Sequence, residues 1–139
     1  MSERAAAARP LVSNNLKEDV MSYVDGFVIA VPKDKVEDYK AMARLGGEVW
    51  MELGALSYVE TLGDDTPYGE VTSFPRAVQA KDDEIVVFSW IVYKDKASRD
   101  EIQAKVMADP RMEPFMKPEN MPFDGKRMIF GGFVPFLEL

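Results

Sequence analysis

Residues 84–93, EIVVFSWIVY, form a run whose β-branched and aromatic side chains occupy both alternating phases. Residues 23–31, YVDGFVIAV, have nearly the same character and end before Pro32. Successive side chains of a strand point to opposite faces, so a strand that is apolar in both phases must be covered on both sides. The two runs therefore predict central strands of a sheet, and they constrain the fold more than any other feature.

Shorter strand-like runs lie elsewhere in the chain. Residues 55–62 and 126–134 predict two further strands. Residues 71–80 would fit a short edge strand, because Pro75 within such a run is tolerated only at an edge or a bulge. The chain thus supplies the strands of one small sheet.

Two helical patterns separate these strands. Asp34, followed by Glu37, has the spacing of a capping box and predicts the start of the first helix. Ser98 and Glu101 repeat this spacing before the second helix, which is expected to stop before Pro110.

Gly46 and Gly47 fall inside the first helix, and Gly54 is a suitable residue to end it. A glycine in a helix interior costs about 1 kcal/mol relative to alanine, so the pair needs a reason. No GxGxxG or Walker pattern surrounds it, and a phosphate-binding loop is disfavoured. We expect the helix to approach the sheet closely here.

The predicted order is β-α-β-β-α-β, which is the split βαβ arrangement of an α+β ferredoxin-like fold. Its antiparallel sheet would have the strand order fourth, first, third, second, with both helices on one face. Nothing in the sequence is assigned to the other face, although the central strands are apolar there as well. An exposed apolar sheet of this size is unfavourable in solution, so we expect a homodimer with two sheets packed face to face.

A single domain accounts for the length of 139 residues. We assign residues 21–139 to this domain. Residues 1–20 mix acidic and basic side chains, are interrupted by Pro10, and read as a flexible tail. No run approaches the roughly 20 apolar residues that cross a bilayer, and the N-terminus lacks the apolar stretch of a signal peptide.

Histidine and cysteine are both absent from the chain. Their absence excludes a Ser-His-Asp triad, a cysteine nucleophile, a histidine-ligated haem and the usual structural zinc sites. No dinucleotide motif is present either, and we expect no haem, zinc or flavin cofactor. A cysteine-free chain fits a reducing compartment, so a cytoplasmic location is expected.

The net charge is −7 and the isoelectric point is about 4.7. A phosphate backbone or an anionic membrane would repel such a surface on average. The sequence therefore predicts neither a nucleic-acid partner nor a membrane partner.

Polar side chains interrupt one face of the apolar strands. Asp25 and Glu60 are the candidate catalytic residues, with Ser89 and Arg127 as ligand-binding neighbours. Two carboxyl groups in one partly buried cavity would raise the pKa of one of them, and this is how a general acid or base is made. The alternative is that these groups pair with backbone amides or with the dimer partner.

Three more side chains are candidate ligand contacts. Tyr58 and Trp90 would line a pocket, and Arg76 would hold an anionic group, although strand aromatics more often pack in a core and such arginines more often form surface or interface salt bridges. The acidic runs at residues 64–65 and 82–84 lack the alternating spacing of calcium loops. We read them as solvated turns and predict no metal site.

Several strings resemble a known family: MSYVDGFVIAVPKD, GALSYVE, TSFPRAV, KVMADPRM and PFDGKRM followed by GGF. They are similar to the YbaA-like family of bacterial proteins, a domain of unknown function, over residues 21–139. The resemblance implies membership of the dimeric α/β-barrel superfamily, which includes cofactor-independent monooxygenases, haem-degrading enzymes and stress proteins. The haem-dependent branches generally use a histidine that this chain lacks.

Two function classes remain open at this point. The first is a cofactor-independent enzyme or binder of a small molecule, with its cavity between sheet and helices. The second is a non-catalytic dimeric module with a stress-related or regulatory role. A cavity that holds Asp25 or Glu60 together with a bound ligand would favour the first class, and a solidly packed sheet interface without a pocket would favour the second.

Overall fold

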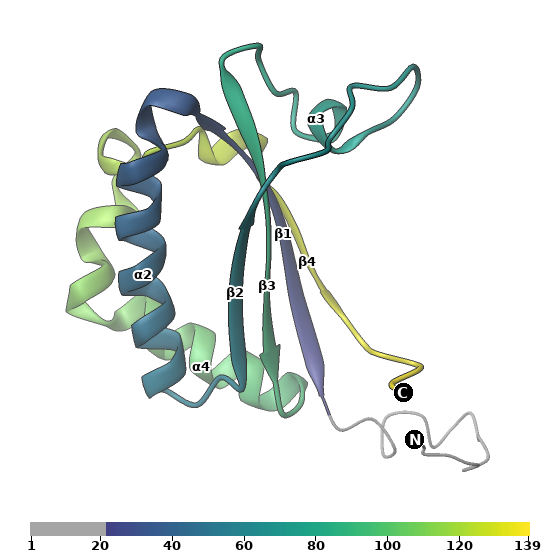
Figure 1. The fold of residues 1–139 in the computed structure, drawn as a ribbon. Coiled ribbons are helices and arrows are strands. Elements are labelled where there is room, and N and C mark those ends of the chain that lie inside the picture. Colours follow the sequence, from purple (N-terminus) through teal and green to yellow (C-terminus); the bar gives the residue numbers. More distant parts are fainter. Residues whose placement is uncertain (1–21) are drawn as a thin grey trace.

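The computed structural model describes residues 22–139, so the predicted tail, residues 1–20, lies outside the described residues. Four antiparallel strands form one sheet in the order β2-β3-β1-β4 (Figure 1). Strands β1 (Tyr23–Pro32) and β3 (Glu84–Tyr93) are central, and β2 (Ser57–Leu62) and β4 (Ile129–Phe133) form the edges. The ferredoxin-like α+β fold and its predicted strand order are confirmed.

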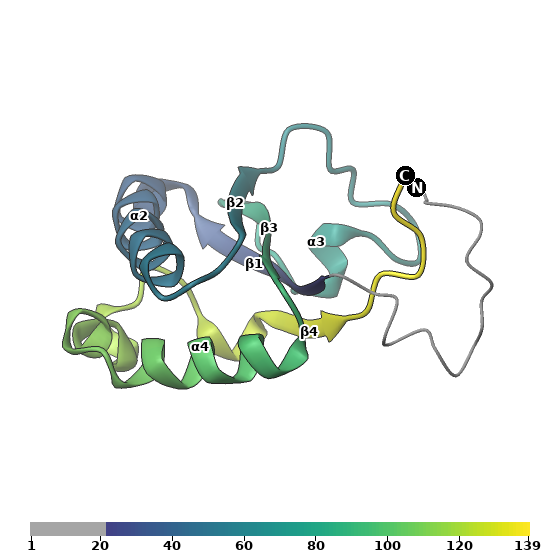
Figure 2. The ribbon, with the colours of Figure 1, turned by 90° about the horizontal axis from the view of Figure 1, so that it is seen from below.

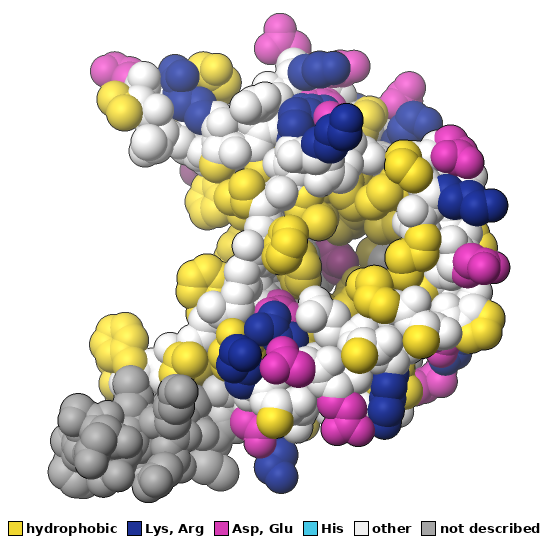
Figure 3. Space-filling view, turned by 180° about the vertical axis from the view of Figure 1, so that it is seen from behind, with side chains coloured by type: hydrophobic (Ala, Val, Ile, Leu, Met, Phe, Trp, Pro, Cys, Tyr) yellow, Lys and Arg dark blue, Asp and Glu magenta, His cyan; other side chains and the backbone are white. Residues whose placement is uncertain are grey.

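Helices α2 (Val36–Glu52) and α4 (Lys96–Ala108) cover one face of the sheet, which we call the helical face (Figure 2). Three short 3₁₀ helices, Pro110–Met116, Pro118–Asn120 and Gly125–Arg127, lead from α4 to β4. Hydrophobic side chains gather around the hollow between sheet and helices (Figure 3). No helix of residues 22–139 has the length and apolarity needed to cross a membrane.

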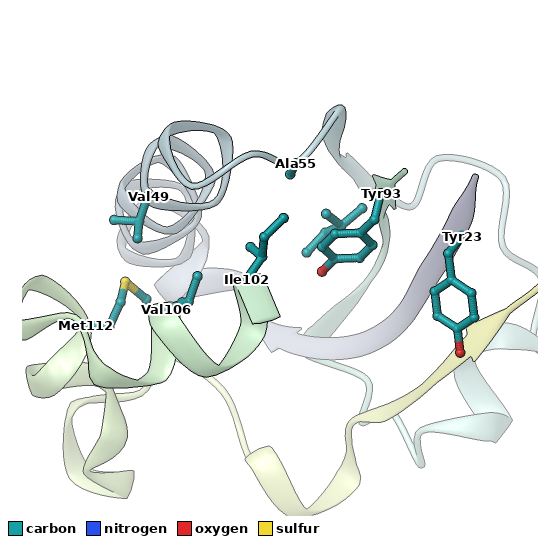
Figure 4. Packing of buried hydrophobic residues seen from close by; sticks show 8 residues of the cluster. Tyr23, Val49, Ala55, Tyr93, Ile102, Val106 and Met112 are labelled. Carbon is teal, nitrogen blue, oxygen red and sulfur yellow. The ribbon is translucent and has the colours of Figure 1, made fainter. Parts of the chain in front are cut away.

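Apolar side chains fill the layer between the sheet and the two helices. Val49 of α2, Val106 of α4 and Tyr93 of β3 have no exposed surface, and they belong to one cluster (Figure 4). Burying a side chain of this kind contributes about 1.5–3 kcal/mol, so this cluster is a main source of stability. It also fixes the positions of the strands and helices that form the cavities described below.

The opposite face, which we call the outer face, is only partly uncovered. Residues 63–83 fold across it and bury Val78, which is 1% exposed, against Val28 and Val86. The expectation that nothing in the chain covers this face is therefore wrong in part. Large apolar side chains remain exposed on the rest of it, namely Phe88 (43%), Ile129 (44%) and Phe133 (61%).

The edge strand expected at residues 71–80 is also wrong. The segment contains the short helix α3 (Phe74–Ala77), and the Arg76 amide donates a hydrogen bond to the Ser73 hydroxyl at its N-cap. Pro75 lies in the first turn, where the missing amide hydrogen costs nothing. The proline therefore marks a helix start here.

Neither predicted capping box forms. A 3₁₀ turn over Lys33–Lys35 follows β1, and α2 begins after it without a side-chain cap from Asp34. The N-cap of α4 is Asp95, whose carboxylate accepts a hydrogen bond of 2.7 Å from the Ser98 amide. Serine and aspartate are comparable N-caps, so the sequence offers two equivalent helix starts three positions apart, at Asp95 and Ser98.

The remaining boundaries differ by a few residues. The strand expected at 126–134 is shorter, because Gly125–Arg127 forms a 3₁₀ helix before β4. Gly54 follows the last helical residues of α2 and has a φ of +119°, so the predicted end of this helix is confirmed.

Candidate functional site

Glu60 is the centre of a polar cluster on the helical face. It lies on β2 opposite Ser89 of β3. The Tyr39 hydroxyl donates a 2.8 Å hydrogen bond to Oε1 of Glu60, and the Tyr58 hydroxyl donates one of the same length to Oε2. Both carboxylate oxygens are therefore held by neutral donors, one from α2 and one from the same strand.

The packing of α2 on β2 positions these tyrosines. Tyr39, Ala43 and Gly47 are four residues apart and share the side of α2 that faces the sheet. An added Cβ at Gly47 would lie 2.8 Å from Cδ1 of the Tyr58 ring, which real side chains do not approach so closely. The predicted close approach is thus confirmed at Gly47, and the glycine makes room for Tyr58.

Two cavities meet at this cluster. The larger one, about 690 Å³, lies between α2 and β2, and we call it the α2–β2 cavity. The smaller one, about 130 Å³, lies beneath the helices and reaches Ser89; we call it the inner cavity. Tyr39, Tyr58 and Glu60 line both cavities. The hydrogen-bonded trio therefore forms a wall between them.

The walls of the α2–β2 cavity are largely apolar, while its rim is charged. Ala43, Met51, Leu62 and Val87 contribute apolar surface. Lys40, Arg44 and Glu48 follow one another at i,i+4 spacing along α2 and are exposed at the rim. A volume of several hundred Å³ with one convergent polar group is typical of a small-molecule site.

Burial shapes the electrostatics of the cluster. It raises the pKa of the Glu60 carboxyl above its usual value, and the hydrogen bonds from Tyr39 and Tyr58 offset part of this rise. Burial and the charge of Glu60 also raise the pKa of both tyrosines, which keeps them protonated as donors. A carboxyl group with a raised pKa accepts a proton more readily than an ordinary one, and this is a property of general acids and bases.

Asp25 belongs to a different network. Arg99 of α4 donates a 2.8 Å hydrogen bond from Nη1 to its Oδ1, and the Tyr93 hydroxyl donates one of 2.9 Å to its Oδ2. The Trp50 indole donates in turn to the Tyr93 hydroxyl at 3.0 Å. Burial raises the pKa of Asp25, and the Tyr93 hydrogen bond and the Arg99 charge counteract it. Asp25 lines neither of the two cavities, so the structure does not bring it together with Glu60 in one site.

Arg127 and Arg76 also lie apart from Glu60. Arg127 forms paired hydrogen bonds of 2.8 and 2.7 Å with the Glu84 carboxylate, and these hydrogen bonds hold the pKa of Glu84 below its usual value. Arg76 donates to the carbonyl oxygens of Tyr68 and Gly69 and stacks 3.9 Å above the Tyr68 ring. Both arginines hold loops in place, and the structure places neither in the predicted polar cavity.

The other candidates divide between the two faces of the sheet. Ser89 and Tyr58 border the inner cavity with Glu60, as their alternation along the strands predicts. The Trp90 side chain packs beside Phe88, with ring centroids 5.5 Å apart, on the outer face, although the residue also borders the inner cavity. Of the seven predicted site residues, Tyr58, Glu60 and Ser89 therefore lie together on the helical face beside the inner cavity.

Sequence reasoning missed Tyr39, Tyr93 and Arg99. Tyr39 and Tyr93 carried a signal, because a buried tyrosine hydroxyl usually has a hydrogen-bond partner. Arg99 gave none, since nothing local distinguishes it from other charged helix residues. The structure groups no three acidic side chains of residues 22–139 into a candidate metal centre.

The family model described as "Protein of unknown function (DUF1428)" matches residues 22–125. The uncharacterised protein YbaA of Escherichia coli K12 is 52% identical over 118 residues, which cover 85% of this chain and 99% of YbaA. The same identity and coverage are found with YbaA of Shigella flexneri.

Two solved structures share the fold at low sequence identity. A dimeric ferredoxin-like protein from an uncultured marine organism has a TM-score of 0.55 at 14% identity, covering 85% of this chain and 98% of that one. A variant of SnoaB, a cofactor-independent oxygenase from Streptomyces nogalater, has a TM-score of 0.50 at 13% identity, covering 86% and 97%. The family match and the identity to YbaA together show that this chain belongs to the DUF1428 family.

Proposed function

We propose that this protein binds a small, largely apolar molecule in the α2–β2 cavity, with Glu60 as the group that recognises the polar end of the ligand. The observation that carries the proposal is the position of Glu60. Its carboxyl group lies on the wall shared by both cavities and is oriented by Tyr39 and Tyr58. Orienting tyrosines keep the carboxyl in one geometry, which is what a recognition or proton-transfer group needs.

Ser89 supports the same interpretation. Its side chain is 4% exposed, and the structure gives its hydroxyl no hydrogen-bond partner among residues 22–139. A buried hydroxyl without a partner is costly, unless water or a ligand completes its hydrogen bonds. The inner cavity joins this hydroxyl to Glu60 and has room for several water molecules, since one water occupies about 30 Å³ of liquid. Water molecules in the inner cavity would relay protons between Glu60 and Ser89. A ligand in the α2–β2 cavity would not block this relay.

A thermal-shift screen of metabolites tests the proposal. A hit at one hundred times its Kd adds about 2.7 kcal/mol to the free energy of unfolding of the wild-type protein. We expect Glu60→Gln to lose this gain. Glu101→Gln is the matched control, because it removes the same charge from an exposed site on α4. Hits that stabilise Glu60→Gln as much as the wild type would place the site elsewhere.

We further propose that the protein is a cytoplasmic homodimer joined through the outer face. The exposed apolar side chains Phe88, Ile129 and Phe133 support this interface, as does the dimeric ferredoxin-like relative. The absence of cysteine supports the location.

A second candidate function is a non-catalytic dimeric module with a stress-related or regulatory role. It is favoured by the same outer face, because apolar surface outside the cavity points to protein contacts. In that case, the metabolite screen yields no hit that depends on Glu60.

A further inference from the structure

We infer that the ligand of the α2–β2 cavity is an organic cation: an apolar body that carries a protonated amine, whose ammonium group binds at Glu60. This inference rests on the proposed function and names the class of ligand. It is argued from the charge balance of the sheet, the donors and acceptors at the site, and the charges on the rim.

Three acidic side chains of the sheet are buried to different degrees, and two of them have a cationic partner. Asp25 is paired with Arg99 at 2.8 Å, and Glu84 with Arg127 at 2.7 Å. Glu60 has no lysine or arginine within salt-bridge distance in the described part of the chain, and its oxygens receive only tyrosine hydroxyls. A buried carboxylate without a counter-charge is unfavourable, and a bound cation would supply the missing charge.

The free hydrogen-bonding capacity that Glu60 and its two tyrosines present to the α2–β2 cavity is of one kind. Each tyrosine hydroxyl has a single proton, and both protons are already directed at Glu60. The remaining lone pairs on the two hydroxyls and on the carboxylate can only accept. The site therefore selects a ligand rich in donors, and an ammonium group offers three donors and no acceptor. A carboxylate or phosphate placed at Glu60 itself would meet only acceptors and a like charge, because Lys40 and Arg44 lie at the exposed rim and are paired with Glu37 and Glu48.

The charges at the rim do not oppose a cation. Lys40 is paired with Glu37 at 3.3 Å, and Arg44 with Glu48 at 3.1 Å, so each basic group has an acidic neighbour on α2. The net charge of −7 adds a general attraction for cations. Apolar wall residues such as Met51 and Leu62 fit the body of the ligand.

Matched probes test the inference. Phenyl, naphthyl and biphenyl bodies are each attached through a two-carbon chain to an amine, an alcohol or a carboxylate. Calorimetry gives the Kd, and amide chemical shifts show whether binding occurs along α2 and β2. We expect the amine of the best-fitting body to bind at least about tenfold more tightly than its alcohol, because a charge-assisted hydrogen bond is about twice as strong as a neutral one. The carboxylate should bind most weakly.

Two variants locate the anchor of the amine. Glu60→Gln should reduce the tenfold preference to within about twofold while the alcohol still binds. Glu101→Gln removes a charge from an exposed site on α4 that lines neither cavity, and it should leave the preference intact. A preference that survives Glu60→Gln, or is lost in Glu101→Gln, contradicts the inference. The wild-type comparison of amine and alcohol remains decisive even where Glu60→Gln fails to fold.

Failure of the inference is distinguishable from failure of the proposed function. Alcohols or carboxylates that bind in the cavity as tightly as amines overturn the cationic ligand and leave the cavity as a binding site. The cationic ligand is also overturned if none of the three amines binds with a Kd below about 10 mM. The metabolite screen, which makes no assumption about charge, then decides the proposed function.

Discussion

The two adjacent glycines of α2 should respond to alanine in opposite ways. An added Cβ at Gly46 would have its nearest atoms at 3.6 Å in Tyr58 and 3.7 Å in Met112, which are ordinary contacts. Gly46→Ala should therefore gain the helix-propensity term and stabilise the fold by about 0.5–1 kcal/mol. At Gly47 the new Cβ would lie 2.8 and 2.9 Å from two atoms of the Tyr58 ring.

The overlap at Gly47 should outweigh the propensity gain. Overpacking of this kind costs about 1–3 kcal/mol, so Gly47→Ala should be between neutral and about 2 kcal/mol less stable than the wild type. The two alanine variants should then differ by about 1–3 kcal/mol in urea unfolding. In a Tyr58→Ala background the clash is absent, and Gly47→Ala should stabilise by up to about 1 kcal/mol. Equal stabilisation by both alanines in the wild-type background would refute the close approach of α2 to Tyr58.

Four further predictions concern the carboxyl groups, the outer face and the N-terminus. Because burial raises the pKa of Glu60 above 4.5, the native state holds its proton to higher pH than the unfolded state, and this group makes stability fall as the pH rises. At pH 7, Glu60→Gln should thus be as stable as the wild type or more stable, and at pH 4 the two proteins should be equally stable. If urea unfolding at pH 7 shows that the variant loses about 1–3 kcal/mol of unfolding free energy, Glu60 has a structural role. Asp25→Asn should lower stability by about 1–3 kcal/mol, because Arg99 loses its buried partner and keeps only the exposed Asp100 as an acidic partner, and an unchanged melting curve would contradict this. The full chain should sediment as a dimer at micromolar concentration, since the expected interface buries on the order of 2,000 Å². Phe88→Asp should sediment as a monomer, and a monomeric wild type would rule out the interface. Deleting residues 1–20 should leave the melting temperature within about two degrees, since surface changes usually contribute less than about 0.5 kcal/mol; a larger loss would show that the segment packs on the domain.

The sequence was informative where structure depends on local periodicity. The run at residues 84–93 was found with its correct bounds, because two-sided apolar character and polar flanks mark a central strand. Glu60, Tyr58 and Ser89 followed from alternation along β2 and β3. Alternation gives the face of a side chain but not the offset between strands.

Features that depend on docking between elements were not predictable in this way. Asp25 lies opposite Ile91, two residues along β3 from the Ser89 that pairs with Glu60, and its partner Arg99 reaches it from α4. The contact between Tyr39 and Glu60 depends on how α2 is seated on the sheet. Alternation and helical period do not determine these relations, because they are set by packing across the interior.

The pairing of β1 has a consequence for how the chain folds during synthesis. Both neighbours of this central strand come later in the sequence, β3 at residues 84–93 and β4 at residues 129–133. A ribosome that adds about 5–20 residues per second needs roughly 3–12 s to extend the chain from the end of β1 to the end of β3. For that interval an apolar strand has no partner on either edge, and the long loop closure that follows makes folding slow for a domain of this size. The nascent chain is therefore most exposed to aggregation, and to chaperone binding, before β3 emerges.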